Sequence, residues 1–225
     1  MWYTTANLSR TSALLFVTGA AVGITAYIIY RLRKLSEEEE NVNTESDQAQ
    51  GSDEDERRIV VLGLDGAGKT SLLSFMSKQE IVHQPTPTDG FNVMCIQNEN
   101  KAINIWEVGG SENIRAYWKN FIQDTNILVF VVDSADRSRV EEAGNALKSI
   151  LREEKLASVP VLVIANKQDV PQALSKDIII KKMGLNEIPE NHCLSVLETQ
   201  VPPNGDIKGV EDVKLQLLSI SSRTG

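Results

Sequence analysis

Residues 57–78 read RRIVVLGLDGAGKTSLLSFMSK, and this stretch decides the fold. It starts with an apolar run typical of a buried strand. It continues as GLDGAGKT at residues 63–70, which fits the pattern GxxxxGK followed by Ser or Thr. A helical pattern follows at once. Backbone N–H groups of such a turn close on phosphate oxygens, and the helix N-terminus adds a positive field. The stretch therefore predicts a phosphate loop, residues 63–70, between the first strand and the first helix of the domain.

The pattern assigns roles to side chains within this phosphate loop. Lys69 is expected to reach the β- and γ-phosphates of a nucleotide, and Thr70 to give its hydroxyl to Mg²⁺. Asp65 is expected to shape the turn rather than to perform chemistry. The predicted nucleotide-binding residues of this region are Gly63, Asp65, Gly66, Ala67, Gly68, Lys69, Thr70 and Ser71.

The base is indicated by NKQD at residues 166–169, which ends the apolar run VLVIAN. The Asp169 carboxylate can accept both N1–H and the exocyclic N2–H of guanine, whereas adenine offers no such donor pair. Asn166 can hold the O6/N7 side, and the Lys167 stem can cover the ring. The sequence therefore predicts GTP and GDP as ligands. The alternative, a kinase or ATPase with the same phosphate loop, conflicts with this motif.

Apolar runs and helical patterns alternate along the rest of residues 57–225. Strands are predicted at 59–63, 91–97, 102–108, 127–133, 161–166 and 193–198, and helices around 70–78, 112–123, 137–154, 175–183 and 207–222. Such alternation indicates a mainly parallel sheet covered on both faces. The short polar link at 98–100 predicts a hairpin. The expected fold is a three-layer α/β domain with a six-stranded, mostly parallel sheet and one antiparallel edge pair.

The net charge of −8 over 225 residues is unevenly distributed. Residues 1–35 hold four basic and no acidic side chains, residues 36–56 hold ten acidic and no basic ones, and residues 57–225 are nearly balanced. The overall negative charge argues against generic nucleic-acid binding. The two cysteines, Cys95 and Cys193, fit a reducing compartment and are expected to be buried thiols in strands.

Residues 11–30 (TSALLFVTGAAVGITAYIIY) carry no charge, and a helix of that length spans the hydrocarbon core of a bilayer. The basic excess on the C-terminal side places that side in the cytosol. A cleaved signal peptide and a mitochondrial transit peptide are alternatives that fit less well. The predicted organisation is a transmembrane anchor at 1–35, an acidic disordered linker at 36–56 and a GTPase domain at 57–225. The mitochondrial outer membrane and the endoplasmic reticulum are the candidate locations.

The motifs together resemble the ADP-ribosylation factor-like (Arf-like) family of Ras-type small GTPases over about residues 57–220. The matching segments are GLDGAGKT, PTDGFN at 87–92, WEVGG at 106–110, FVVDSAD at 130–136 and NKQD. The resemblance implies a switch whose two mobile segments order around GTP and Mg²⁺. It implies effectors as partners, and an exchange factor and a GTPase-activating protein as regulators.

The resemblance also implies roles for residues outside the phosphate loop. Thr88 would give Mg²⁺ a hydroxyl when GTP is bound, and Glu107 would contact the metal in its outer sphere. The Gly110 N–H would meet the γ-phosphate, so Gly110 also counts as nucleotide-binding. The implied catalytic set is Lys69, Thr88, Gly110 and Ser111. An aromatic trio that effectors contact would be Phe91, Trp106 and Phe121, although core packing also explains these rings.

The sequence departs from the family pattern at several positions. Ser111 stands where the family usually has the glutamine that orients the attacking water, so intrinsic hydrolysis is expected to be slow or negligible. Glu107 is one methylene longer than the usual aspartate. Trp2 excludes N-myristoylation of a glycine. Leu197, Glu198 and Thr199 stand roughly where the family has a small-residue base-capping motif, and VPPNGD at 201–206 resembles an insertion, so a weaker guanine affinity is expected. Two functions stay open: a hydrolysing switch and a non-hydrolysing, GTP-bound scaffold.

Overall fold

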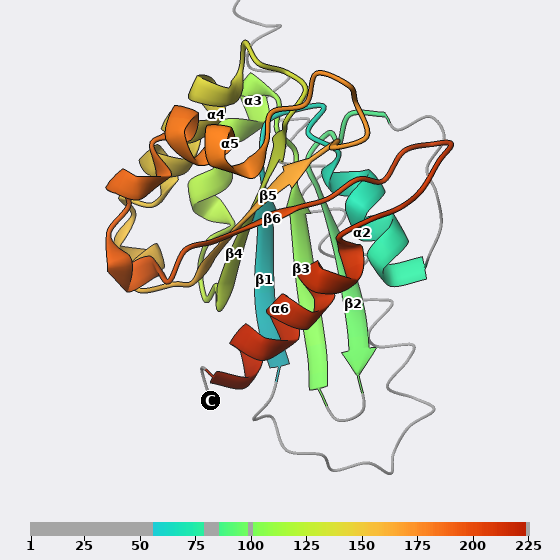
Figure 1. The fold of residues 1–225 in the computed structure, drawn as a ribbon. Helices are drawn as coiled ribbons and strands as arrows, with labels where there is room; N and C mark the ends of the chain where they lie inside the picture. The colour runs from blue at the N-terminus through green and yellow to red at the C-terminus, as the bar shows by residue number, and fades with distance from the viewer. Residues whose placement is uncertain (1–55, 79–85, 99–100, 224–225) are drawn as a thin grey trace, which may run out of the picture. The chain divides into compact units, whose positions relative to one another are not determined.

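A computed structural model describes residues 56–78, 86–98 and 101–223 (Figure 1). The predicted anchor at 1–35, and the linker at 36–56 up to its last residue, lie outside the described residues. Within the described part of the chain, no helix is both long and apolar enough to cross a membrane.

The centre of the domain is a six-stranded sheet of order β2-β3-β1-β4-β5-β6. All neighbouring strands are parallel except β2 and β3, which pair antiparallel from Phe91 opposite Val108 to Asn98 opposite Lys101. The predicted sheet and its single edge hairpin are therefore confirmed. The strands are β1 (Glu56–Leu62), β2 (Phe91–Asn98), β3 (Lys101–Val108), β4 (Ile127–Asp133), β5 (Val161–Asn166) and β6 (Ser195–Glu198).

Helices cover both faces of the sheet, as Figure 1 shows. On β1, Ile59 and Val61 face the core under α2 (Lys69–Lys78) and α6 (Val210–Arg223). Val60 and Leu62 face the opposite core, which includes residues of α4 (Val140–Ile150) and α5 (Lys176–Met183). This alternation follows from the period-two geometry of a strand that is buried on both faces.

The parallel register brings the carboxyl ends of β1, β4 and β5 to one edge of the sheet. The phosphate loop leaves β1 at this edge, and residues 166–169 begin where β5 ends. Two motifs that are about 100 residues apart in sequence are thus neighbours in space. They lie at the carboxyl ends of the strands, where open α/β sheets usually bind their ligands.

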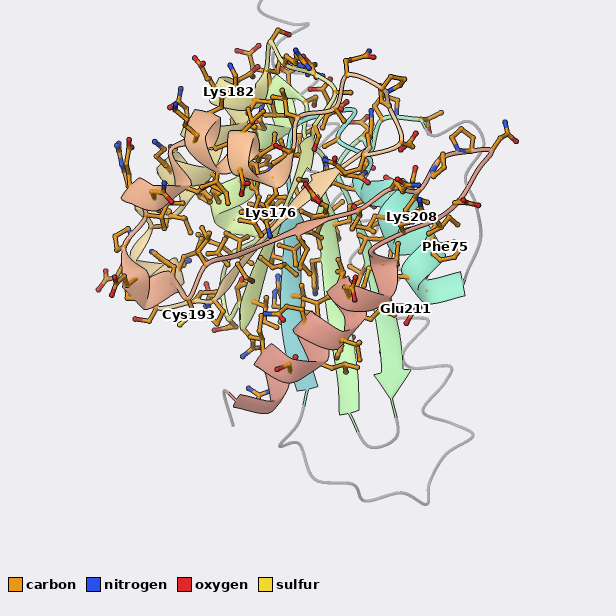
Figure 2. The ribbon with its side chains drawn as sticks, in the orientation of Figure 1. Phe75, Lys176, Lys182, Cys193, Lys208 and Glu211 are labelled. Carbon is orange, nitrogen blue, oxygen red and sulfur yellow. The ribbon has the colours of Figure 1, made fainter. Side chains whose placement is uncertain are left out.

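Three details of the prediction are wrong. The helix expected at 112–123 is broken into α3 (Glu112–Arg115) and a 3₁₀ turn (Trp118–Asn120), because the Trp118 side chain turns inward and is buried. The helix expected at 137–154 is α4 followed by a separate 3₁₀ turn (Glu154–Leu156). Cys95 and Cys193 are exposed. Cys193, which is labelled in Figure 2, lies before β6 and has φ of +43°.

Candidate nucleotide-binding site

A cavity of about 370 Å³ lies over the carboxyl edge of the sheet. Its phosphate end is formed by the phosphate loop with Thr88, Glu107 and Gly110, and its base end by Asn166, Lys167 and Asp169. Of the predicted nucleotide-binding and metal-binding residues, all except Gly63 and Ala67 line this cavity. Those that do are Asp65, Gly66, Gly68, Lys69, Thr70, Ser71, Thr88, Glu107, Gly110, Asn166, Lys167 and Asp169, joined by Ser111 of the implied catalytic set.

Lys69 is held by the backbone of its own loop. Its Nζ donates to the carbonyl oxygens of Gly63 at 2.9 Å and Leu64 at 3.0 Å, and the residue is only 5% exposed. Burial lowers the pKa of Lys69 to about 8, while the Glu107 and Asp65 carboxylates act in the opposite direction. Gly63 and Ala67 serve the site through their backbone carbonyls rather than by lining it.

Two threonine hydroxyls and one carboxylate meet beside Lys69. The Thr70 hydroxyl donates to Glu107 Oε1 at 2.5 Å and the Thr88 hydroxyl donates to the same oxygen at 3.2 Å. Asn92 Nδ2 donates to Glu107 Oε2 at 3.0 Å. Glu107 is fully buried, so these donors replace the water that its charge would otherwise require. The extra methylene of Glu107 is thus used to reach hydroxyls from both the phosphate loop and the segment before β2.

The Gly109–Gly110 segment packs directly against the phosphate loop. A Cβ at Gly110 would sit 2.2 Å from the carbonyl oxygen of Gly63 and 2.4 Å from the backbone nitrogen of Asp65. Trp118 Nε1 donates to the carbonyl of Gly109 at 2.9 Å, which fixes the segment from the other side. Only glycine allows this approach of two backbones.

Asn166 joins the base end to the phosphate loop. Its Nδ2 donates to the carbonyl of Ala67 at 3.0 Å, and its Oδ1 accepts from the Thr199 hydroxyl at 2.9 Å. Both Asn166 and Thr199 are buried. Lys167 adopts φ of +65° and its Nζ lies 2.7 Å from Asp133 Oδ2 at the end of β4.

Residues 197–199 do not line the cavity. Thr199 is buried behind Asn166, and the cavity wall is built by Val201, Pro202 and Pro203. Two backbone hydrogen bonds between Gln200 and Lys208 close the loop that these residues begin. Figure 2 labels Lys208, which lies before α6. The segment that looked like an insertion therefore contributes part of the site.

Sequence reasoning missed Arg139, which lies before α4. Its Nη1 is 3.0 Å from Asp65 Oδ1, its Nη2 is 3.3 Å from the Asp65 carbonyl, and its Nε is 2.6 Å from Asp136 Oδ2. Hydrogen bonds from Ser138 and Arg139 lower the pKa of Asp136 to about 2. The hydrogen bond to Asp136, more than the charge of Asp65, raises the pKa of Arg139. No local pattern signals a contact between residues 74 positions apart.

The predicted aromatic trio is contiguous in space. The Phe91 ring lies 5.5 Å from the Trp106 ring in a stacked arrangement and 5.2 Å from the Phe121 ring. The Arg58 guanidinium lies 4.0 Å from the centre of the Trp106 ring. All three rings are half-buried and pack against the core, and Val93, opposite Trp106 in the sheet, is 41% exposed.

Comparisons with known proteins agree with this geometry. The ADP-ribosylation factor-like protein 2 of Drosophila melanogaster is 44% identical over 141 residues, which cover 63% of this chain and 76% of that protein. The ADP-ribosylation factor-like protein 3 of Chlamydomonas reinhardtii is 44% identical over 135 residues, covering 60% of this chain and 76% of that protein.

A solved structure shares the fold. The small GTPase Arl6 (BBS3) of Trypanosoma brucei, with the bound nucleotide analogue GppNp, matches with a TM-score of 0.67 at 24% identity, covering 76% of this chain and 99% of that one. The profile of the ADP-ribosylation factor family matches residues 44–213. This chain therefore belongs to the ADP-ribosylation factor family and is a GTP-binding switch protein of the Arf-like type.

Proposed function

We propose that the protein is a Mg²⁺-dependent GTP/GDP switch that recruits effectors to an intracellular membrane. The observation that carries the nucleotide part is the single cavity that joins the phosphate loop at one end to Asn166, Lys167 and Asp169 at the other. A polyphosphate and a guanine base have complementary partners at these two ends. The cavity is large enough for a small-molecule ligand.

The residues present fit a magnesium ion. Mg²⁺ prefers octahedral oxygen ligands at 2.0–2.1 Å, which places neighbouring ligands about 3 Å apart. The hydroxyl oxygens of Thr70 and Thr88 are 3.1 Å apart, and both donate their protons to Glu107, which leaves their lone pairs free to face a metal. A bound Mg²⁺ would neutralise charge on the β- and γ-phosphate oxygens.

Effector binding is proposed for the surface around Phe91, Trp106 and Phe121. The half-exposed Val93 extends this apolar surface along β2, which is an edge strand of the sheet. Asn92 of this strand and Thr88 of the segment before it both donate to Glu107, so a change at the metal end would be transmitted to this surface. An exchange factor and a GTPase-activating protein are proposed as further partners.

The membrane part of the proposal depends on residues 11–30, whose lack of charge suits a single-pass anchor with the GTPase domain in the cytosol. An N-terminal apolar segment combined with an atypical second switch resembles the ADP-ribosylation factor-like proteins nine and ten, and we propose a kinship with them. The mitochondrial outer membrane and the endoplasmic reticulum are the proposed locations. Imaging of the full-length protein beside a variant lacking residues 1–35 tests this part, and a truncated protein that stays on membranes contradicts it.

Nucleotide binding is tested by titrating the purified full-length protein with fluorescent GDP, GTP and ATP. Tight binding of both guanine nucleotides, weak binding of ATP, and faster release after magnesium chelation are expected. The Asp169→Asn variant should lose the preference for guanine. Equal affinity for ATP and GTP would contradict the proposed base end.

A second candidate function, a non-hydrolysing GTP-bound scaffold, is favoured by Ser111. This residue lines the cavity at the start of α3, where its short side chain cannot bridge a water and a γ-phosphate as a glutamine does. Single-turnover GTP hydrolysis of the wild type and of Ser111→Gln separates the two functions. We expect the variant to be faster. A wild-type rate equal to that of a glutamine-bearing relative would refute the scaffold.

A further inference from the structure

The phosphate loop contains a carboxylate, Asp65, on the side where phosphates would bind. Asp65 lines the cavity that is proposed to hold the polyphosphate of GTP, and its side chain is 46% exposed. A carboxylate beside several phosphate charges raises the free energy of the complex unless a cation compensates it. Asp65 therefore needs a partner that the phosphate loop itself does not supply, since Lys69 is directed to the carbonyls of Gly63 and Leu64.

Arg139 is that partner, and its geometry is fixed from two sides. The Nη1 and Nη2 edge of the guanidinium donates to the Asp65 carboxylate and the Asp65 carbonyl, and Nε donates to Asp136 at 2.6 Å. Asp136 also accepts from the Ser138 hydroxyl at 2.6 Å, which orients the carboxylate. A planar guanidinium with several donors is suited to such a bridge, whereas an ammonium acts as a point charge.

The ion pair contributes little to folding by itself. The Arg139 side chain is 37% exposed, and exposed pairs typically change the free energy of unfolding by less than about 1 kcal/mol. Its larger effect is expected on a highly charged ligand close to Asp65. A nucleotide adds negative charge with each phosphate, so the cost of an uncompensated Asp65 rises from GMP to GDP to GTP.

We propose that Arg139 is a positioning residue for nucleotide binding, which holds Asp65 and compensates its charge so that the phosphate loop can accept a polyphosphate. This inference rests on the proposed binding of guanine nucleotides. It predicts that the loss of affinity caused by replacing Arg139 grows with the number of phosphates on the nucleotide. It also predicts that the affinity returns when Asp65 is made neutral as well.

The test measures the affinities of full-length Arg139→Gln for GMP, GDP and GTP by displacement of fluorescent GDP. We expect a loss on the order of tenfold for GTP, a smaller loss for GDP and little change for GMP. The double variant Asp65→Asn/Arg139→Gln should regain most of the GTP affinity. Arg139→Lys, which keeps the charge but loses the several contacts of the guanidinium, should retain part of it.

Arg137→Gln is the matched control, because it removes the same charge two residues earlier. Arg137 is exposed and its Nε donates to the carbonyl of Gln172 at 3.0 Å, away from Asp65. Its GTP affinity should equal that of the wild type. Thermal unfolding of both single variants shows whether either of them has lost its fold, and the double variant provides the comparison if Arg139→Gln is unstable.

The outcomes separate the possible failures. Equal losses for all three nucleotides, without recovery in the double variant, would overturn the proposal and assign Arg139 a structural role. Unchanged affinities in Arg139→Gln would overturn it as well. A wild-type protein that binds no guanine nucleotide would refute the proposed function instead. A loss that grows with phosphate number and shrinks at high salt supports the proposal.

Discussion

The buried hydroxyl of Thr199 offers the sharpest test of how the base end is built. Thr199→Val keeps the shape of the side chain and removes the hydroxyl that donates to Asn166 Oδ1 at 2.9 Å. Asn166 is 2% exposed and Thr199 is 1% exposed, so no bulk water replaces the lost donor. The Asn166 Oδ1 atom is then left buried without its hydrogen-bond partner.

The magnitude follows from that geometry. An unsatisfied buried polar group costs about 1–3 kcal/mol, and a neutral hydrogen bond contributes about 1 kcal/mol net. We therefore expect Thr199→Val to lower the free energy of unfolding by about 1–3 kcal/mol. Because Asn166 also fixes the carbonyl of Ala67, part of this loss should appear in nucleotide binding. A share of about 1.4 kcal/mol corresponds to tenfold faster release of GDP at an unchanged association rate.

Thr125→Val is the matched control for this variant. Thr125 is also buried, at 7% exposure, and its hydroxyl donates to the carbonyl of Ile122 at 2.8 Å, outside the cavity. Urea unfolding should show a loss of stability in both variants, whereas stopped-flow release of fluorescent GDP should be faster only in Thr199→Val. Equal release rates in the two variants would refute the coupling of Thr199 to the nucleotide through Asn166.

Three further perturbations follow from the phosphate end. Burial lowers the pKa of Lys69 to about 8 and bound phosphate raises it, so binding takes up a proton above pH 8. Calorimetric GTP affinity should therefore be constant below pH 8 and fall by up to about tenfold per pH unit above it; a flat profile would contradict a buried lysine. Gly110→Ala places a Cβ 2.2 Å from the carbonyl oxygen of Gly63, so the variant should lose the extra thermal stability that GTP gives over GDP. Trp118→Phe removes the donor to the carbonyl of Gly109, so the free energy of unfolding, measured in urea, should fall by about 1–3 kcal/mol. An unchanged value would mean that this carbonyl turns to solvent instead.

The parts of the fold that were predicted correctly depend on short-range patterns. Buried parallel strands are nearly continuous apolar runs, so β1, β4 and β5 are visible in the sequence, and the short polar link at 98–100 reveals the antiparallel pair of β2 and β3. The phosphate loop and residues 166–169 are contiguous strings placed at strand ends. The helix at 112–123 was wrong because its amphipathic pattern also fits a short helix followed by a turn. The short helix followed by a turn is the one that forms, because it buries the Trp118 ring and lets its Nε1 donate to the carbonyl of Gly109.

The missed parts of the site depend on contacts between distant segments. Residues 197–199 stand where the family has its base-capping motif, but β6 pairs with β5 so that Glu198 lies opposite Ala165, and the Thr199 hydroxyl bonds to Asn166 rather than lining the cavity. That register, which periodicity does not reveal, moves Val201 to the cavity. Arg139 was missed for a related reason, since its reach to Asp65 depends on how the loop after β4 is folded.

The phosphate loop is held by the last residue of β5 and by the loop that follows β4. Asn166 at the base end donates a hydrogen bond to the carbonyl of Ala67, and Arg139 in the loop before α4 donates to the Asp65 carboxylate. One contact is buried and neutral while the other is partly exposed and charged, so they should respond differently to salt. High salt should reduce the effect of Arg139→Gln on GTP affinity and leave that of Thr199→Val unchanged. The geometry thus assigns the neutral contact to the base and the charged contact to the phosphates, and salt distinguishes the two contributions.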